Sequence, residues 1–366
     1  MTSDKGILIK NIYYMLTYAF QSLRQSNYDL VAAEEFENIH DMFAAILGKG
    51  VASQLKQGLY REYILREEEL SVLRGKLNIQ GTIRNKIQHK QKLSCEYDEL
   101  SENNLLNQIL KTTMQVLVRQ KTVKQEKKAV LKKNLVFFDN VDVIEPGQIR
   151  WDRIRYQKNN QSYRMLMNVC YLVITGLILS TDKGEVKLAT FLDDRAMHSL
   201  YEKFILEYYR YHHPEYKANP DTIPWDIDDG MIEFLPAMVT DITLKHGEKT
   251  LIIDAKYYAH TMQSQYDIQS IHSGNLYQVF TYVKNLDKDN TGNVAGMLLY
   301  AKTQEQITPN NKYSMGGNTI WVKTLDLNLP FTQIAEQLEK IVADYFGEDD
   351  ACTKTLLLQR NLTGKL

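Results

Sequence analysis

The chain has 366 residues, of which 44% are hydrophobic and 24% are charged, with 44 Lys and Arg against 45 Asp and Glu. This length and composition exclude a disordered protein, a fibrous repeat and a small disulfide scaffold, because enough apolar surface is available for large buried cores. The formal net charge of -1 means that a polyanionic partner would have to be bound by local basic patches.

Cysteine usage and the apolar segments indicate a cytoplasmic protein. Cys95, Cys170 and Cys352 are odd in number and far apart, which argues against a disulfide framework and against a Cys-based metal site. The start of the chain shows no secretory signal pattern. The longest apolar run, residues 169–179, is shorter than the roughly 20 residues that span a bilayer, so we expect a buried helix there and no membrane partner.

The first half of the chain is predicted to be an α+β module that is mostly helical. Apolar residues recur at helical spacing in four segments, residues 10–23, 36–55, 105–118 and 163–179. Residues 60–79 are strand-like, with Gly75 as punctuation. We therefore expect an N-terminal module over residues 1–190.

After residue 190 the pattern changes to that of an α/β domain, predicted for residues 191–347. The expected order is α-β-β-β-α-β, at residues 195–212, 223–227, 237–244, 250–257, 276–283 and 294–300. A further strand at 319–325 and an amphipathic helix at 331–346 close this domain. Residues 348–366 are polar and are expected to form a C-terminal tail.

The segment from residue 235 to 258 contains the candidate catalytic residues. As a β-hairpin that turns at residues 246–249, it sets Asp241 opposite Asp254. The same register pairs apolar residues on the other face, Ile242 with Ile253 and Leu244 with Leu251. The apolar pairs are expected to cover a core, and the two acids are expected to point outward.

Two directly opposed aspartates repel each other unless a cation lies between them, because their Cβ atoms are about 4.5 to 5.5 Å apart. Oxygen ligands without His or Cys favour Mg²⁺, with Mn²⁺ as an alternative, so Asp241 and Asp254 are the predicted metal ligands. Lys256 projects from the same strand face as Asp254. Its ammonium would orient or deprotonate a water and stabilise the charge of the transition state, as metal-assisted phosphodiester hydrolysis requires.

Three further residues are candidate supporting groups. Gln278 and Tyr282 are four residues apart and therefore share one face of a helix, and Glu202 is a candidate third acid on the helix before the hairpin. Each also has a structural interpretation, as an exposed helix former, a core aromatic and a helix-surface acid respectively. No catalytic role is expected for any of the eight histidines.

Two basic stretches are candidate contacts for DNA. Residues 119–133 hold seven Lys or Arg against one Glu, and residues 84–92 hold four basic groups and no acid. A solvated helix face is the better explanation of the first stretch. The sequence leaves open whether either stretch binds phosphates or an acidic protein partner.

The Asp, spacer, Asp-x-Lys arrangement in this element order resembles the PD-(D/E)XK nuclease core, with Thr240 in place of the usual Pro and Asp254 in place of the commoner Glu. The Gln278-x-x-x-Tyr282 pair resembles a pair found at the active site of RecB-like branches of that superfamily. The alternative is a surface hairpin with a solvated salt bridge. The apolar run at residues 251–253 favours a central strand instead. A charged side chain on such a strand is uncommon and indicates a specific role.

A larger part of the chain resembles the McrC family. The resemblance extends from about residue 8 to 347 and is carried by NIYYMLTYA at 11–19, RGK at 74–76, TD at 240–241, DAKYY at 254–258 and NLYQ at 275–278. It implies the nuclease subunit of a modification-dependent restriction system. It also implies that the N-terminal module docks onto a McrB-like hexameric AAA+ ring and stimulates its GTPase, while the C-terminal domain cuts double-stranded DNA.

The family's partner hydrolyses GTP and reads methylated cytosine. This chain has no G-x-x-x-x-G-K-[ST] loop, so GTP is expected to bind to the partner and not to this chain. No base-flipping module is evident either. The prediction is a Mg²⁺-dependent DNA endonuclease that acts within a GTPase complex. Two alternatives stay open, a non-catalytic adaptor that activates the ring and a stand-alone RecB-like repair nuclease.

Overall fold

The computed structural model describes residues 3–4, 7–19, 36, 38–157, 160–179, 194–228, 231–257, 262–265, 268–302 and 308–347. The chain divides into two compact units, of which unit 1 comprises residues 1–42 and 189–366 and unit 2 comprises residues 43–188. Unit 2 is therefore inserted between the two parts of unit 1. This corrects the expected N-terminal module of residues 1–190. Residues 1–42 belong to unit 1, together with the C-terminal part of the chain. The expected tail lies outside the described residues.

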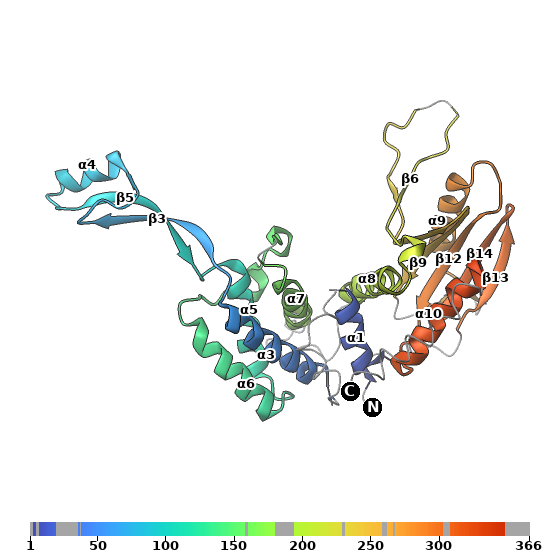
Figure 1. The fold of residues 1–366 in the computed structure, drawn as a ribbon, viewed down its shortest axis with the longest axis horizontal. Coiled ribbons are helices and arrows are strands. Elements are labelled where there is room, and N and C mark those ends of the chain that lie inside the picture. Colours follow the sequence, from blue (N-terminus) through green and yellow to red (C-terminus); the bar gives the residue numbers. More distant parts are fainter. Residues whose placement is uncertain are drawn as a thin grey trace. The chain divides into compact units, whose positions relative to one another are not determined.

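A five-stranded mixed sheet forms the core of unit 1 (Figure 1). Its order is β13-β14-β12-β9-β8, with β12 parallel to both of its neighbours and the two outer strands antiparallel to theirs. The strands are β8 (Ile242–His246), β9 (Lys249–Lys256), β12 (Val294–Ala301), β13 (Asn311–Met315) and β14 (Asn318–Leu325). All of β12 and most of β9 are buried, as in strands that are covered on both faces.

The helix α9 (Ser273–Leu286) covers one face of this sheet, and α10 (Phe331–Phe346) follows β14. Val279 and Val283 of α9 share an apolar cluster with Ile252 and Leu298 of the sheet. Gly296 makes this close packing possible, because a Cβ at that position would lie 2.3 Å from Val279 Cγ1 and 2.9 Å from Val283 Cγ2. The sheet and α9 therefore meet at a residue that has no side chain.

The first helix of the chain, α1 (Ile9–Ala19), completes unit 1 by packing against α8 (Asp194–His212). The ring of Tyr18 stacks on Phe331 at the start of α10, with 5.5 Å between the ring centroids. Asn11 Nδ2 donates hydrogen bonds of 2.7 Å to the carbonyl oxygens of Leu327 and Leu329. These contacts explain why α1 belongs to the unit that contains the sheet.

The strands before β8 differ from those expected. The strand predicted at 223–227 is only β6 (Thr222–Ile223), because Pro224 follows and lacks the N–H that a ladder needs. The strand predicted at 237–244 is divided into β7 (Met238–Val239), which pairs with β6 in a separate sheet, and β8. The α-β-β-β-α-β order is therefore only partly correct, since β6 lies outside the main sheet.

Several short elements were not expected from the sequence. Besides β13, they include β1 (Ser3–Asp4) paired with β2 (Ile7–Leu8), and a hairpin of β10 (Met262–Gln265) with β11 (Ile268–Ile271) between β9 and α9.

Unit 2 has a helical part that contains the helices expected at residues 36–55, 105–118 and 163–179. It consists of most of α3 (Ile39–Gln57) with α5 (Leu105–Arg119), α6 (Gln125–Leu135) and α7 (Tyr163–Leu179). The apolar run at 169–179 lies in α7, and no helix of the described residues is long and apolar enough to cross a membrane. Cys95 and Cys170 are buried free thiols, whereas Cys352 lies outside the described residues.

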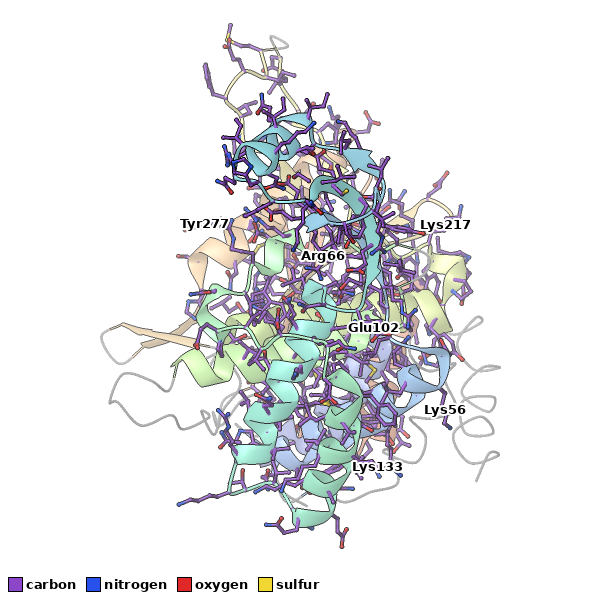
Figure 2. All side chains as sticks on the ribbon, turned by 90° about the vertical axis from the view of Figure 1, so that its left-hand side faces the viewer. Lys56, Arg66, Glu102, Lys133, Lys217 and Tyr277 are labelled. Atoms are coloured by element: carbon purple, nitrogen blue, oxygen red, sulfur yellow. The ribbon has the colours of Figure 1, made fainter. Side chains whose placement is uncertain are left out.

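The other part of unit 2 is a projecting three-stranded sheet, which we call the arm (residues 61–101). It contains β3 (Glu62–Leu70), β4 (Lys76–Leu77), α4 (Ile79–Ile87) and β5 (Leu93–Ser101), with the antiparallel strand order β3-β5-β4. Figure 1 shows β3 and β5 extending away from the helices of the same unit, with α4 toward their far end. Side chains stand out along the arm, among them Arg66, which is labelled in Figure 2.

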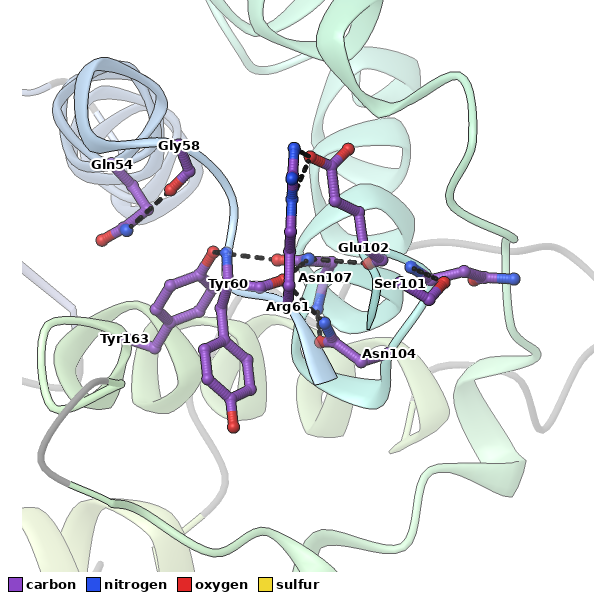
Figure 3. A network of polar contacts seen from close by, with 10 residues as sticks. Gln54, Gly58, Tyr60, Arg61, Ser101, Glu102, Asn104, Asn107 and Tyr163 are labelled. Carbon is purple, nitrogen blue, oxygen red and sulfur yellow. Dashed lines mark hydrogen bonds and ion pairs between the residues drawn. The ribbon is translucent and has the colours of Figure 1, made fainter. Parts of the chain in front are cut away.

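A network of buried amides fixes the base of the arm (Figure 3). Asn104 Nδ2 and Asn107 Nδ2 each donate a hydrogen bond of 2.8 Å to the carbonyl oxygen of Tyr60. The Tyr163 hydroxyl donates to Asn107 Oδ1 at 2.9 Å and accepts from the Tyr60 amide at 2.9 Å. Tyr60, two residues before β3, is thus held by hydrogen bonds with α5, its N-cap and α7.

The basic stretch at 119–133 forms much of α6 and exposes Lys132 and Lys133, the latter labelled in Figure 2. The stretch at 84–92 runs from the end of α4 to the start of β5 and is also largely exposed. Both stretches are exposed enough to contact a partner. Whether they bind DNA phosphates or an acidic protein stays a prediction.

Candidate functional site

Asp254 lies on β9, between β8 and β12 in the main sheet. The hairpin register is the predicted one, with Ile242 facing Ile253 and Leu244 facing Leu251. The loop is shorter than expected, because His246 still pairs with Lys249. Asp254 is only 1% exposed, so the expectation that it points outward is wrong. Its strand face is the one that α9 covers through Ile252.

Asp241 directly precedes β8, so the pairing of β8 with β9 begins at the next residue, Ile242, and does not include Asp241. Its Oδ2 accepts a hydrogen bond of 3.0 Å from the backbone amide of Ala255. The preceding residue, Thr240, is held by Asp221, whose amide donates to the Thr240 hydroxyl at 2.9 Å and whose carbonyl accepts from the Thr240 amide at 2.9 Å. These bonds fix the backbone that leads into Asp241 and place its carboxylate against β9.

Lys256 brings a cation to both carboxylates from the strand face that it shares with Asp254. Its Nζ lies 2.9 Å from both carboxylate oxygens of Asp254 and 3.8 Å from Asp241 Oδ2. Only Asp254 Oδ1 has the geometry of a hydrogen bond, and no described residue donates one to the buried Asp254 Oδ2. The three predicted catalytic side chains therefore converge, and Asp254 Oδ2 is the buried carboxylate oxygen that accepts no hydrogen bond from a described residue.

Burial and mutual charge set the protonation of this group. Burial raises the pKa of Asp254 to about 7, the ammonium of Lys256 acts against this shift, and the carboxylate of Asp241 adds to it. Burial also raises the pKa of Glu202 to about 7, with a further contribution from Asp241. The site therefore holds more carboxylate groups than its one lysine can neutralise.

Glu202 reaches the site from α8, together with a histidine that sequence reasoning missed. His198 Nε2 lies 3.1 Å from Glu202 Oε1, and His198 Nδ1 accepts a hydrogen bond of 3.4 Å from the Tyr257 amide at the end of β9. Because Nδ1 is an acceptor, the proton is assigned to Nε2, which faces Glu202. The i, i+4 spacing of His198 and Glu202 was the sequence signal available.

Gln278 and Tyr282 are brought together on α9. Gln278 Nε2 donates to the Tyr282 hydroxyl at 2.8 Å, and this hydroxyl donates to the carbonyl oxygen of Val239 at 3.1 Å. The Tyr282 ring packs in the apolar cluster beneath α9. The pair thus anchors the strand end two residues before Asp241.

The donor set of the site suits a hard divalent cation. Asp241 and Asp254 offer carboxylate oxygens only, which is the ligand type that Mg²⁺ prefers, and the buried Asp254 Oδ2, although 2.9 Å from Lys256 Nζ, accepts no hydrogen bond from a described residue. Glu202 does not complete a set of three, because no group of three or more His, Cys, Asp or Glu among the described residues is arranged to hold a metal ion. The residues present therefore fit an ion that keeps several waters.

Comparison with known proteins places the chain in a family. The family of McrBC 5-methylcytosine restriction system components matches residues 3–301, and the chain belongs to it. A curated relative is the type IV methyl-directed restriction enzyme EcoKMcrBC of Escherichia coli K12. The two are 28% identical over 350 residues, which cover 93% of this chain and 98% of the relative.

Two solved structures are also similar. One is a refined half-complex from a tetradecameric assembly of Thermococcus gammatolerans McrB AAA+ hexamers with bound McrC. It matches with a TM-score of 0.52 and 20% identity, covers 92% of this chain and 75% of the matched chain, and shows a shared fold. The other, a cryo-EM structure of the McrBC complex of the same organism, has a TM-score of 0.42 and 25% identity over 54% of this chain and 56% of that one.

Proposed function

We propose that the chain is the nuclease subunit of a methylcytosine-dependent restriction complex and hydrolyses phosphodiester bonds of double-stranded DNA. The observation that carries this proposal is the convergence of Asp241, Asp254 and Lys256, with the ammonium 2.9 Å and 3.8 Å from the two carboxylates. Two carboxylates and an ammonium at one point are what metal-assisted phosphodiester hydrolysis needs. Membership of a restriction-system family supports DNA as the substrate.

The corresponding fold assignment is the PD-(D/E)XK nuclease core. In this assignment α8, the β8–β9 hairpin, α9 and β12 supply the core elements in chain order. Thr240 occupies the position of the usual Pro, and its hydroxyl accepts from the Asp221 amide and shares a 2.8 Å hydrogen bond with the Thr243 hydroxyl. Hydrogen bonds thus fix the backbone where the commoner residue would fix it through its ring.

Asp241 and Asp254 would hold Mg²⁺, or Mn²⁺, through their carboxylate oxygens. When bound, such an ion supplies Lewis acidity that lowers the pKa of a water and neutralises charge on the phosphate. Lys256 then turns its ammonium to the reacting phosphate, where it orients the attacking water and stabilises the developing negative charge. Glu202, which burial leaves with a pKa of about 7, would accept a proton from that water.

The arm supplies the surface for a protein partner. Its far end exposes six apolar side chains, between 37% and 74% exposed, which we call the arm-tip patch: Val72, Leu73, Leu77, Ile79, Ile83 and Ile87. Three of them recur every four residues along α4 and therefore form one stripe. An apolar patch of this kind on a folded protein marks an interaction site.

The partner that we propose is a McrB-like AAA+ hexamer, because the similar solved assembly contains McrB AAA+ hexamers with bound McrC. In this complex the ring binds GTP and selects the modified DNA. Contact through the arm stimulates GTP hydrolysis by the ring, and the complex acts in the cytoplasm.

The arm also favours a second candidate function, that of a non-catalytic activator of the ring. In that function Asp241, Asp254 and Lys256 form a buried ion cluster that maintains the fold of unit 1 and takes no part in hydrolysis. A stand-alone repair nuclease is less well supported, since it would have no use for an exposed arm-tip patch.

Cleavage of methylated plasmid by the complete complex with GTP and Mg²⁺ separates these functions. Asp254→Asn and Lys256→Gln should each reduce cleavage about 100-fold or more, while GTP hydrolysis by the ring stays at the wild-type rate. EDTA should abolish cutting, and added Mn²⁺ should restore it. Asp289→Asn, an exposed acid near the start of β12, is the matched control.

Wild-type cutting by both site variants would reject the nuclease function. If wild type and both variants fail to cut yet all raise GTP turnover, the chain is an activator only.

A further inference from the structure

A cavity with a charged lining lies within unit 1, on the face of the main sheet opposite to Asp254. It has a volume of about 750 Å³ and is bounded by the ends of β12 and β14, by α10 and by residues 308–312. Its charged lining residues are four lysines and two aspartates: Lys302, Lys312, Lys323, Lys340, Asp326 and Asp344.

The charges of this lining do not cancel. Lys302 pairs with Asp326 at 2.6 Å, and Lys323 pairs with Asp344 at 2.7 Å. Lys312 and Lys340 form no ion pair with any acid among the described residues. The cavity therefore keeps two positive charges for a ligand.

Trp321 adds a hydrogen-bond donor to these charges. It lines the cavity, is 4% exposed, and its indole Nε1 has no acceptor among the described residues. The Nζ atoms of Lys323 and Lys312 lie 4.5 Å and 5.6 Å from the centroid of its rings. Buried N–H groups are nearly always paired, so this donor points to an acceptor that a ligand would bring.

The sheet register places the cavity level with the nuclease site, on the opposite face of the sheet. In neighbouring strands Ala255 pairs with Leu299, and Leu299 pairs with Lys323, so the cavity lies two strands from β9 and level with the catalytic residues. Two strand spacings amount to roughly 9 to 10 Å. Lys323 faces α10, whereas Asp254 faces α9, so the two sites open on opposite faces at the same end of the sheet.

We infer that this cavity binds a phosphate of the DNA backbone, apart from the phosphate that is cut. A backbone phosphodiester carries one negative charge and two free acceptor oxygens, which suit the Trp321 N–H and the ammonium groups of Lys312 and Lys340. The inference rests on the proposed function for the identity of the anion.

Binding of duplex DNA to the full-length chain tests this, measured in EDTA over a series of salt concentrations. Lys312→Gln/Lys340→Gln should weaken binding about tenfold and lower the slope of log affinity against log salt by about 0.9, the value for one phosphate contact. Lys288→Gln is the control, since this lysine pairs with Asp226 near the other end of β12. It should leave both quantities unchanged.

The emission of Trp321 gives a second measurement that does not depend on the lysine variants. In a chain that carries Trp151→Phe and Trp225→Phe, Trp321 is the remaining tryptophan, and duplex DNA should change its fluorescence. Unchanged affinity together with unchanged emission overturns the inference. A response to inorganic phosphate or GTP without a response to DNA also overturns it, because the site would then take small phosphates.

The outcome for the proposed function is separate. If the lysine variants bind and cut DNA like wild type while Asp254→Asn does not cut, only this inference fails. If wild type never cuts yet the lysine variants lose DNA affinity as described, the proposed function fails and the phosphate site stands.

Discussion

His198 links the backbone of β9 to the acid of α8. Its Nδ1 accepts from the Tyr257 amide, and its Nε2 lies 3.1 Å from Glu202. A carboxylate held in this way keeps a fixed position relative to Asp254 and Lys256, which lie one to three residues before Tyr257. His198 is therefore a positioning residue that acts through Glu202.

We expect His198→Ala to lower kcat for DNA cleavage about tenfold with little change in KM or in GTP hydrolysis. His198→Gln should recover part of the loss, because its amide can also accept from Tyr257 and donate to Glu202. The effects of His198→Ala and Glu202→Gln should not add, since the two residues act as a unit. Rates measured on the single and double variants check this, and full additivity would contradict it.

A second histidine, His213, forms a buried ion pair with Glu339 of α10. The Nε2 of His213 lies 2.8 Å from Glu339 Oε2, and its Nδ1 lies 3.1 Å from Glu215. Burial acts to lower the pKa of His213, but the hydrogen bonds to the two acids outweigh burial and raise it. For Glu339, burial acts to raise the pKa, but the hydrogen bond from His213 outweighs it and the pKa is lowered.

These shifts predict a stability maximum between the ordinary pKa values of Glu and His, about 4.3 and 6.5. The contribution of His213 is lost as the pH rises through its raised pKa, and that of Glu339 is lost as the pH falls through its lowered pKa. Glu339→Gln should therefore reduce the free energy of unfolding by about 3 kcal/mol at pH 5.5 and by less at pH 9. Urea unfolding at both pH values measures this, with exposed Glu336→Gln as control. Equal losses at the two pH values would refute the prediction.

The residues of the site differ in how far the sequence reveals them. Asp241, Asp254 and Lys256 could be located because apolar alternation fixes the register of a local hairpin. For His198 the only signal was its i, i+4 spacing to Glu202, because its other partner is a backbone amide 59 residues away that carries no residue-specific signal.

At the scale of elements, the same contrast separates β9 from β5. The β9 strand has an apolar run that predicts a buried strand, whereas β5 reads LSCEYDELS and has charges along it. Its pairing with β3 is supported by contacts across the strands, such as Arg66 with Glu99 at 3.0 Å and the Tyr97 hydroxyl with Glu68 at 2.8 Å. Such pairs become visible only when the partner strand is known.

The β13–β14 hairpin was missed although its turn carries a signal. Gly316 and Gly317 both have positive φ, 57° and 87°, which is the backbone of a two-residue hairpin turn and favours glycine at both positions. Because β13 is polar and lies at the edge of the sheet, it lacks the apolar pattern of a buried strand. The Gly316-Gly317 turn was thus a stronger sequence signal for this hairpin than the residue pattern of β13.

Packing of α9 on the sheet should tolerate no side chain at residue 296. Gly296→Ala would place a Cβ 2.3 Å from Val279 Cγ1, so α9 must shift, and we expect a loss of about 1 to 3 kcal/mol in the free energy of unfolding. Gly147→Ala is the control, because no atom lies within 4 Å of a Cβ there. Val279→Ala should partly rescue Gly296→Ala in denaturant titrations. No rescue would mean that the clash is not with Val279.

At the scale of the whole molecule, the chain separates the unit that carries the arm-tip patch from the unit that contains the candidate nuclease site. Ile79→Ser/Ile83→Ser/Ile87→Ser should therefore abolish ring binding and GTPase stimulation while the Tm stays within a degree or so of wild type, because all three side chains are already exposed. Val136→Ser/Val143→Ser, exposed in unit 2 but outside the arm, is the matched control. Retained stimulation would exclude the arm-tip patch as the contact.

The hydrogen bond from Asn11 to the carbonyl of Leu327 spans 316 residues of sequence. During translation, α1 leaves the ribosome long before α8 and α10 exist, whereas residues 43–188 emerge together and can fold as a unit. The nascent chain thus presents a finished arm before the strands that carry Asp254 and Lys256 have been made. The order of synthesis makes the arm-tip patch, the proposed surface for the partner, available earlier than the residues that would cut DNA.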